Sequence, residues 1–191
     1  MAGTFKDFLK DISNRADDIR NKRVKPDQDN MLKITTDGRK AALDMRLVDL
    51  IFGRESDSKV MRCAENIADI YYDTRDTNSI QLVFCDISTP KEGFNLYDEL
   101  KSLLIAMGIP GNKIAFIHEA ENERQKEELF KELRKGEKSV LIGSTFKTGH
   151  GVNIQERLVA MHHLDVPWRP ADMVQREGRI LRRGNTSKNI K

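Results

Sequence analysis

From Ser58 onward the chain alternates short apolar runs with amphipathic segments, joined by connections of a few residues. Runs without a clear polar–apolar alternation are typical of strands that are covered on both faces, as in a parallel sheet. The repeated order of strand and helix therefore predicts an α/β fold: a three-layer sandwich with a mainly parallel central sheet. The predicted strands are residues 80–85 (IQLVFC), 114–117 (IAFI), 139–142 (SVLI) and 158–164 (LVAMHHL).

Amphipathic segments lie before and between these runs and predict helices. Asn122 is followed three residues later by Gln125, as in a capping box, and Gly136 is a typical helix end. The predicted helices are residues 58–71, 89–108, 122–136 and 171–183.

Residues 1–57 carry a weaker pattern. Apolar residues at 5–12 recur at helical spacing, whereas residues 20–30 are nearly all polar or charged and predict a linker. A second helix is predicted to follow Asp37-Gly38. We therefore expect a helical extension at 1–57 and the α/β domain at 58–191, with its final strand truncated.

Composition excludes several classes of protein. No run of 18 or more apolar residues is present, so we expect no membrane-spanning helix. The first ten residues lack the apolar core of a secretory signal, which predicts a cytoplasmic location. Cys63 and Cys85 lie in apolar segments and are expected to be buried free thiols. The four histidines show no metal-ligand spacing, so no metal site is predicted.

Positive charge is concentrated at the end of the chain. Residues 168–191 hold five arginines and two lysines against two acidic residues, whereas the whole chain has a net charge of only +3. A basic end on a near-neutral body predicts a local site for an anion. A solvated cationic helix end is the alternative.

The last predicted helix separates charge from apolar residues. At about 100° per residue, Gln175, Arg179 and Arg182 share one face, and Arg176 and Arg183 flank it. Guanidinium groups on such a face can grip phosphate oxygens in a fork. The opposite side is predicted to pack on the sheet: Met173, Val174, Ile180 and Leu181.

The loop after the third predicted strand is rich in glycine and hydroxyl side chains. Residues 143–153 read GSTFKTGHGVN. Ligands of open α/β sheets bind where loops leave the carboxyl ends of strands, and glycines allow the backbone to approach a phosphate. The loop is therefore a candidate phosphate site, or otherwise a plain turn.

Together these segments resemble superfamily 2 helicases. Residues 165–170 (DVPWRP) and 175–185 (QREGRILRRGN) resemble motif VI and the sequence before it, most closely in the Swi/Snf-type branch. Residues 144–153 resemble motif V of that branch, and residues 80–86 correspond to motif IV. The resemblance covers residues 58–185 in the expected order and spacing.

A narrower resemblance is to helicase-like regions of bacterial mobile-element and phage proteins, which are often fused to an adenine-specific DNA methylase. Residues 37–47 (DGRKAALDMRL), 84–90 and 168–172 carry it. The chain departs from the general Swi/Snf pattern with Arg169 for Asn, Glu177 for an apolar residue and Asn185 for Gln.

The resemblance implies the second, C-terminal RecA-like lobe of a DNA-dependent ATPase. In such a motor Arg179 and Arg182 would be the catalytic residues, as arginine fingers on ATP. The implied ATP-binding residues are Gln175, Gly178, Gly149, Gly151 and Asn153, of which the last three also couple the nucleotide to DNA. The residues implied to touch the DNA backbone are Ser144, Thr145 and Thr148.

The motifs of a first lobe are missing from the sequence. It contains no Gly-x-x-x-x-Gly-Lys, and its one Asp-Glu pair, Asp98-Glu99, lies within a predicted helix and is expected on a solvated face. We therefore expect ATP with Mg²⁺ to be held mainly by a first lobe, and this fragment to be inactive as an ATPase on its own. The implied partners are DNA, that first lobe and a DNA methylase domain.

Two other interpretations remain open. The chain can be a non-catalytic module, derived from a helicase lobe, that binds nucleic acid or protein. It can also be a small-molecule enzyme built on the Gly151 loop, although His150 is the only neighbouring candidate for a nucleophile–base pair.

Overall fold

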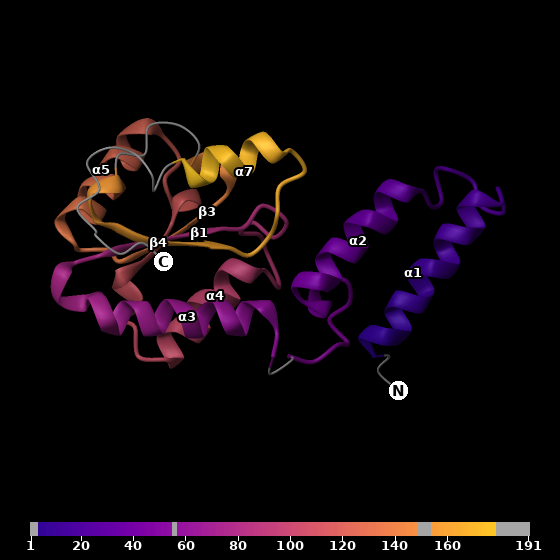
Figure 1. The fold of residues 1–191 in the computed structure, drawn as a ribbon, viewed down its shortest axis with the longest axis horizontal. Helices are drawn as coiled ribbons and strands as arrows, with labels where there is room; N and C mark the ends of the chain where they lie inside the picture. Colours follow the sequence, from indigo (N-terminus) through magenta and orange to yellow (C-terminus); the bar gives the residue numbers. More distant parts are fainter. Residues whose placement is uncertain (1–3, 55–56, 149–153, 179–191) are drawn as a thin grey trace. The chain divides into compact units, whose positions relative to one another are not determined.

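The computed structural model describes residues 4–54, 57–148 and 154–178 (Figure 1). The chain divides into two compact units, Met1–Lys59 and Val60–Lys191. Each unit is described by itself.

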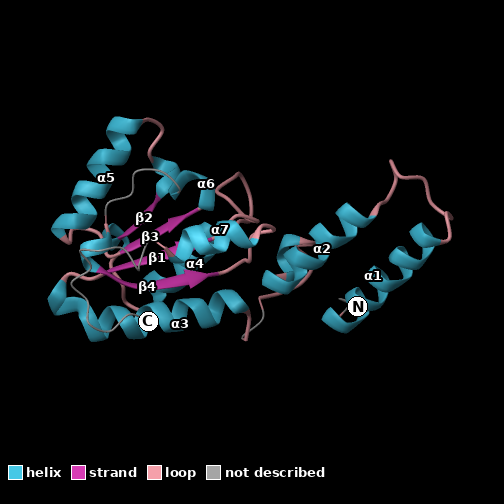
Figure 2. Cartoon of the chain, turned by 45° about the horizontal axis from the view of Figure 1, so that its top comes forward, coloured by secondary structure: helices cyan, strands magenta, loops and turns pink. Residues whose placement is uncertain are grey.

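The second unit is built on a sheet of four strands in the order β2-β3-β1-β4, and every neighbouring pair is parallel. Helices cover both faces of this sheet: α3 and α4 lie on one face, α5 and α7 on the other (Figures 1 and 2). The predicted three-layer α/β sandwich is therefore confirmed. Its elements are α3 (Lys59–Thr74), β1 (Ile80–Phe84), α4 (Leu96–Ala106), β2 (Ile114–Phe116), α5 (Glu123–Lys135), β3 (Val140–Gly143), α6 (Thr145–Thr148), β4 (Leu158–His163) and α7 (Pro170–Glu177).

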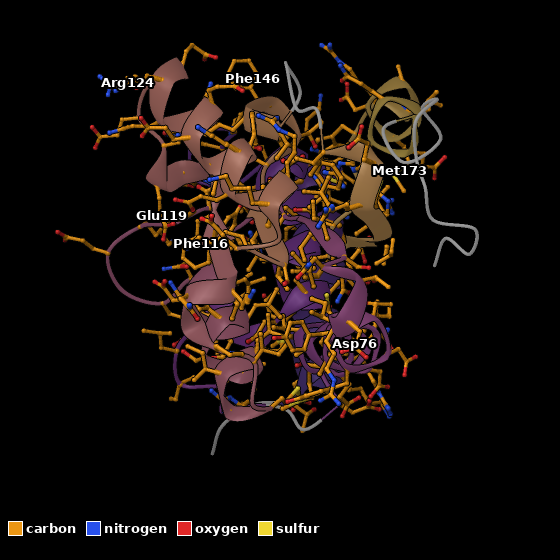
Figure 3. The ribbon with its side chains drawn as sticks, turned by 90° about the vertical axis from the view of Figure 1, so that its left-hand side faces the viewer. Asp76, Phe116, Glu119, Arg124, Phe146 and Met173 are labelled. Carbon is orange, nitrogen blue, oxygen red and sulfur yellow. The ribbon has the colours of Figure 1, made fainter. Side chains whose placement is uncertain are left out.

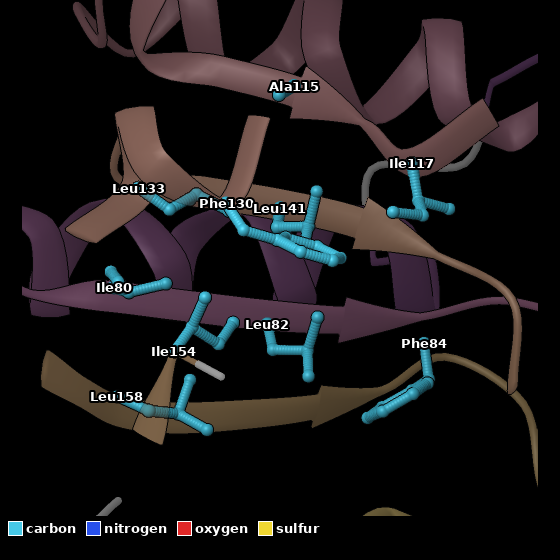
Figure 4. Packing of buried hydrophobic residues seen from close by; sticks show 10 residues of the cluster. All are labelled: Ile80, Leu82, Phe84, Ala115, Ile117, Phe130, Leu133, Leu141, Ile154 and Leu158. Atoms are coloured by element: carbon cyan, nitrogen blue, oxygen red, sulfur yellow. The ribbon is translucent and has the colours of Figure 1, made fainter. Parts of the chain in front are cut away.

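The strands are apolar because both of their faces are covered. All five residues of β1 are buried, and the four residues of β3 are buried as well. On one face, alternate residues of β1 pack with α5 and the neighbouring strands in a ten-residue cluster, drawn in Figure 4. On the other face, the amide of Gln81 donates to the carbonyl of Ile67 in α3 (2.9 Å). Cys63 and Cys85 are buried free thiols, as expected, and burial raises the pKa of each to about 12.

One helix of this unit begins later than predicted. α4 begins after Asn95, not at Thr89-Pro90, because the Asn95 side chain accepts from the backbone N–H of Asp98 (3.0 Å) and the Ser88 hydroxyl accepts from that of Leu96 (2.9 Å). By contrast, α5 begins after Asn122 and ends at Gly136, as predicted.

The acidic pair on α4 also differs from expectation. Asp98 is exposed, but Glu99 is buried, so only the first of the two lies on a solvated face.

The first unit contains α1 (Phe5–Arg20) and α2 (Met31–Leu43). The prediction that the second helix follows Asp37-Gly38 is wrong. Asn30 caps α2 by accepting from the backbone N–H of Lys33 (3.0 Å), so the helix runs through the glycine. Arg15 of α1 binds Asp29 (2.7 Å) and Asp37 (3.1 Å), which ties the two helices together.

Within the described ranges, no helix has both the length and the apolar character needed to cross a bilayer. The predicted truncated final strand falls in residues 179–191, which lie outside the described residues.

Candidate functional site

Polar side chains from three separate segments meet at the carboxyl edge, the edge of the sheet where β1, β3 and β4 end (arrowheads in Figure 2). Asp86 follows β1, Thr145 follows β3, and Asp165 follows β4. Arg176 of α7 joins all three. We call these four residues the Arg176 junction.

Arg176 is fully buried, and each of its five N–H groups has an acceptor. Its Nε donates to the Thr145 hydroxyl (2.7 Å), and Nη1 donates to the Asp165 carbonyl (2.8 Å) and, at 3.4 Å, to His163 Nδ1. Nη2 donates to the carboxylates of Asp86 (2.6 Å) and Asp165 (3.2 Å). The guanidinium carbon also lies 4.8 Å from the centre of the Phe84 ring, a cation–π contact.

The two carboxylates of the junction are held by backbone groups as well. Asp165 Oδ2 accepts from the N–H groups of Asp86 (2.6 Å) and Ile87 (2.7 Å). Asp86 accepts from the N–H and the hydroxyl of Thr145, both at 2.7 Å. The single guanidinium of Arg176 can therefore pair with two carboxylates, because backbone N–H groups also stabilise the negative charge of these carboxylates. The result is a rigid connection between α7 and the loops after three strands.

The structure corrects the predicted orientation of α7. Helical spacing places Arg176 at the flank of an outward face and Val174 toward the sheet, but Arg176 is 0% exposed and Val174 is 68% exposed. The reason is that a helical wheel assigns every arginine to the solvent-exposed face. In the structure, two acids at the strand ends offer Arg176 ion-pair partners inside the protein. One signal could have revealed this: Asp86 and Asp165 each directly follow a predicted strand, where Asp165 is buried and Asp86 is half-buried, and acids in such places favour a cation beside them.

Only part of the predicted nucleotide site falls in the described residues. Gln175 is exposed, and its amide makes no hydrogen bond to another described residue. Gly178 is exposed at the end of α7. The remaining predicted residues lie outside the described residues: Arg179, Arg182, Gly149, Gly151 and Asn153.

The three residues predicted to touch DNA lie together, with their hydroxyls engaged inside the protein. Thr145 bonds Asp86 and Arg176 within the junction. Thr148 is fully buried and donates to the carbonyl of Ser144, and the Ser144 hydroxyl accepts from the backbone N–H of Lys147 (3.3 Å). Gly143 permits this tight turn, since a Cβ there would clash with the methyl group of Thr148. The contact with DNA stays a prediction, and the side chain of Thr148 is not available for it.

Two histidines of β4 face opposite sides of the sheet. His162 Nε2 lies 2.9 Å from the Gln81 side-chain oxygen; that oxygen can only accept, so His162 donates. His163 stacks on Phe84, with ring centres 5.6 Å apart. Burial lowers the pKa of His162 to about 4. The pKa of His163 is also lowered, mainly by burial and to a smaller extent by the positive charge of Arg176.

The pKa of His162 predicts how stability depends on pH. The unfolded chain takes up a proton near pH 6.5, whereas the folded chain does so only near pH 4. The free energy of unfolding should therefore be fully retained above pH 6.5 and fall by roughly 3 kcal/mol as the pH drops to 4. Urea unfolding of the wild type and His162→Gln across this range measures it, and we expect a shallower slope in the variant. Parallel pH profiles would contradict this assignment.

The second unit is thus a three-layer α/β domain with a parallel sheet, helices on both faces and a polar site at its carboxyl edge. Residues 58–184 match the helicase conserved C-terminal domain, and the chain belongs to this family.

Solved structures also resemble the chain. One is the crystal structure of the Pyrococcus furiosus Hef helicase domain, with 18% sequence identity and a TM-score of 0.45; the match covers 91% of this chain. The chain spans only a third (33%) of that structure's chain. No curated protein matches the sequence.

Proposed function

We propose that this chain is the second lobe of an ATP-driven DNA helicase or translocase of the Swi/Snf type, with Arg179 and Arg182 as its arginine fingers. The observation that supports this most directly is the buried Arg176 junction. It fixes α7 against the segments that follow β1, β3 and β4. Gly178, at the end of α7, is therefore held on a rigid support at the carboxyl edge. Catalytic groups need such a support, because their effect depends on precise placement.

The residues at this edge fit a nucleotide. The Gln175 amide is exposed and available as a donor, and Gly178 adds no side chain beside it. Bound ATP with Mg²⁺ supplies the phosphoryl group that is transferred. In this proposal Arg179 and Arg182 stabilise the charge that develops during the transfer, while Gly149, Gly151 and Asn153 connect the nucleotide to the DNA contact.

The DNA contact is proposed at the segment that begins with Ser144. Because the hydroxyls of Thr145 and Thr148 are engaged inside the protein, their role is to shape the backbone that meets DNA phosphates. Such contacts fix position without reading base sequence. The Swi/Snf type and an association with a DNA methylase rest on the sequence resemblance alone.

ATP turnover tests this function. The 191-residue chain with ATP, Mg²⁺ and DNA should show no hydrolysis above background, because the sequence contains no Gly-x-x-x-x-Gly-Lys loop to hold the phosphates. Adding a first RecA-like lobe in trans should produce hydrolysis that DNA stimulates, with the first lobe alone as the control. Robust hydrolysis by the isolated chain would contradict the proposal. DNA binding without turnover in the reconstituted pair would instead identify a non-catalytic module.

A further inference from the structure

The loop that joins α1 to α2 in the first unit lines a cavity (Figure 1). The cavity has a volume of about 410 Å³, and three apolar side chains form part of its wall: Ile19, Val24 and Pro26. Ile19 and Val24 are half-buried and Pro26 is exposed. Pockets that hold ligands have volumes from about 300 Å³ upward. This cavity, which we call the hairpin cavity, is therefore large enough to receive a large apolar side chain of another molecule.

Hydrogen bonds hold the loop around the hairpin cavity in one conformation. The Lys33 ammonium donates to the carbonyls of Asp27 (2.9 Å) and Gln28 (3.0 Å). The backbone N–H groups of Gln28 and Asp29 both donate to the carbonyl of Lys25, at 3.0 and 3.1 Å. A cavity that is already formed binds its ligand at a smaller cost in conformational entropy.

The wall of the hairpin cavity carries two cations without an acidic partner. Lys22 and Lys25 line the cavity, and the ammonium group of neither forms an ion pair or a hydrogen bond with any residue that the structure describes. By contrast, Arg124 on α5, which points outward in Figure 3, binds Glu128 (3.3 Å). The hairpin cavity therefore combines an apolar wall with two uncompensated positive charges.

The other polar groups of the wall are already engaged. Both carboxylate oxygens of Asp29 accept from Arg15, at 2.7 and 3.0 Å. The side chain of Asn30 accepts from the N–H of Lys33 and donates to the carbonyl of Pro26, both at 3.0 Å. No free acid of the wall competes for the two lysines, so charge complementarity favours an anionic ligand.

Lys22 has a backbone conformation that favours glycine. Its φ is +55°, and it directly follows Asn21, the C-cap of α1. The N–H groups of Lys22 and Arg23 donate to the carbonyls of Ile19 (3.0 Å) and Asp18 (2.8 Å), which are the two bonds of a Schellman motif. Glycine is usual at this position because it has no Cβ to crowd the following carbonyl oxygen. Residues held in such conformations cluster at binding sites.

Apolar surface continues beyond the hairpin cavity. Met31 and Leu32 directly follow Asn30 and are 45% and 70% exposed. Two residues of chain span at most about 7 Å, so the Cα of Leu32 lies no farther than this from that of Asn30. A small molecule inside the cavity would leave Leu32 uncovered, whereas a peptide segment extends far enough to contact both.

We propose that the hairpin cavity binds an acidic peptide segment of a partner protein. A large apolar side chain of that segment enters the cavity, and glutamates or aspartates beside it pair with Lys22 and Lys25. The apolar wall distinguishes this ligand from a nucleic acid, because phosphates would need the lysines alone. The cavity lies entirely within the first unit, so the inference does not depend on the proposed ATPase function.

A panel of labelled peptides tests both parts of this recognition. Each seven-residue peptide is capped at both ends and has a central leucine, phenylalanine or tryptophan, two glutamates on either side and a glycine at each end. Matched peptides carry glutamine for every glutamate, or serine at the centre. Fluorescence anisotropy with the 191-residue chain should give a Kd of about 10 to 100 µM for at least one acidic apolar peptide. Both matched sets should bind at least about tenfold more weakly.

Substitutions separate the charges from the apolar wall. Lys22→Asn combined with Lys25→Gln should weaken acidic peptides about tenfold and leave the glutamine peptides unchanged. Asparagine tolerates a positive φ, so the midpoint of urea unfolding, followed by far-UV circular dichroism, should not fall. Val24→Ser should weaken the acidic peptides about tenfold. Lys10→Gln is the control, because it removes an exposed lysine about 13 Å along α1 from Ile19, and it should have no effect.

Three outcomes would overturn the inference. The first is that no acidic peptide binds more tightly than about 1 mM. The second is equal binding of the glutamine peptides, or equal losses in Lys10→Gln and the double lysine variant. The third is displacement of the peptide by labelled DNA whose affinity does not change in Val24→Ser, which would assign the lysines to nucleic acid. None of these outcomes affects ATP turnover, so failure of this inference is distinguishable from failure of the proposed function.

Discussion

Replacing Arg176 with methionine is expected to lower the free energy of unfolding of the α/β unit by about 3 to 5 kcal/mol. The substitution keeps an unbranched apolar stem but leaves the carboxylates of Asp86 and Asp165 facing each other without their cation. Removing one partner of a buried ion pair costs far more than the pair contributes, because the remaining charge stays desolvated. Denaturant unfolding followed by Trp168 emission measures this, since the tryptophan belongs to the same unit.

Matched variants test whether charge is the cause. Arg169→Met removes an exposed arginine directly before α7 and should change stability by no more than about 0.5 kcal/mol. Asp165→Asn in the Arg176→Met background should recover part of the loss, because one uncompensated carboxylate is removed. An Arg176→Met protein as stable as Arg169→Met would show that the junction contributes little.

Arg179→Ala and Arg182→Ala are each expected to lower ATP turnover by about 10³- to 10⁵-fold once a first lobe is present. An arginine finger acts on charge that develops in the transition state, so kcat should fall much more than KM rises. Steady-state kinetics of the reconstituted pair with saturating DNA measures this effect.

Arg183→Ala is the control for the two arginine fingers, because it removes the same charge from the flank of the predicted face. It should leave kcat within a few-fold of the wild type. Equal, modest losses in all three variants, accompanied by the same reduction in the salt dependence of DNA binding, would indicate a basic patch without a catalytic role.

The architecture could be predicted because its signals are local. Short runs such as 80–85 and 139–142 are apolar throughout, which is characteristic of strands covered on both faces, and these runs are the buried β1 and β3. Asn122 and Gly136 act within one helical turn of the ends of α5, so their spacing was sufficient to place that helix.

Helix starts were harder to place where several residues can cap. Thr89 and Asn95 are both residue types that can cap the start of α4. The structure selects Asn95, because the loop after β1 brings the Ser88 hydroxyl to the N–H of Leu96. The same ambiguity explains α2, where Asn30 rather than Asp37 caps the start of the helix.

By itself, the sequence determined the order of strands and helices and the motif order of a helicase C-terminal domain, since both depend on residues close together in the chain. Only the tertiary structure decided that Arg176 is buried and that Phe146 is exposed. Asp86 lies 90 residues from Arg176, and only the parallel pairing of β1 with β3 and β4 brings its carboxylate into contact. A charged side chain enters a protein interior where opposite charges and N–H donors converge, and that convergence is a property of the folded sheet.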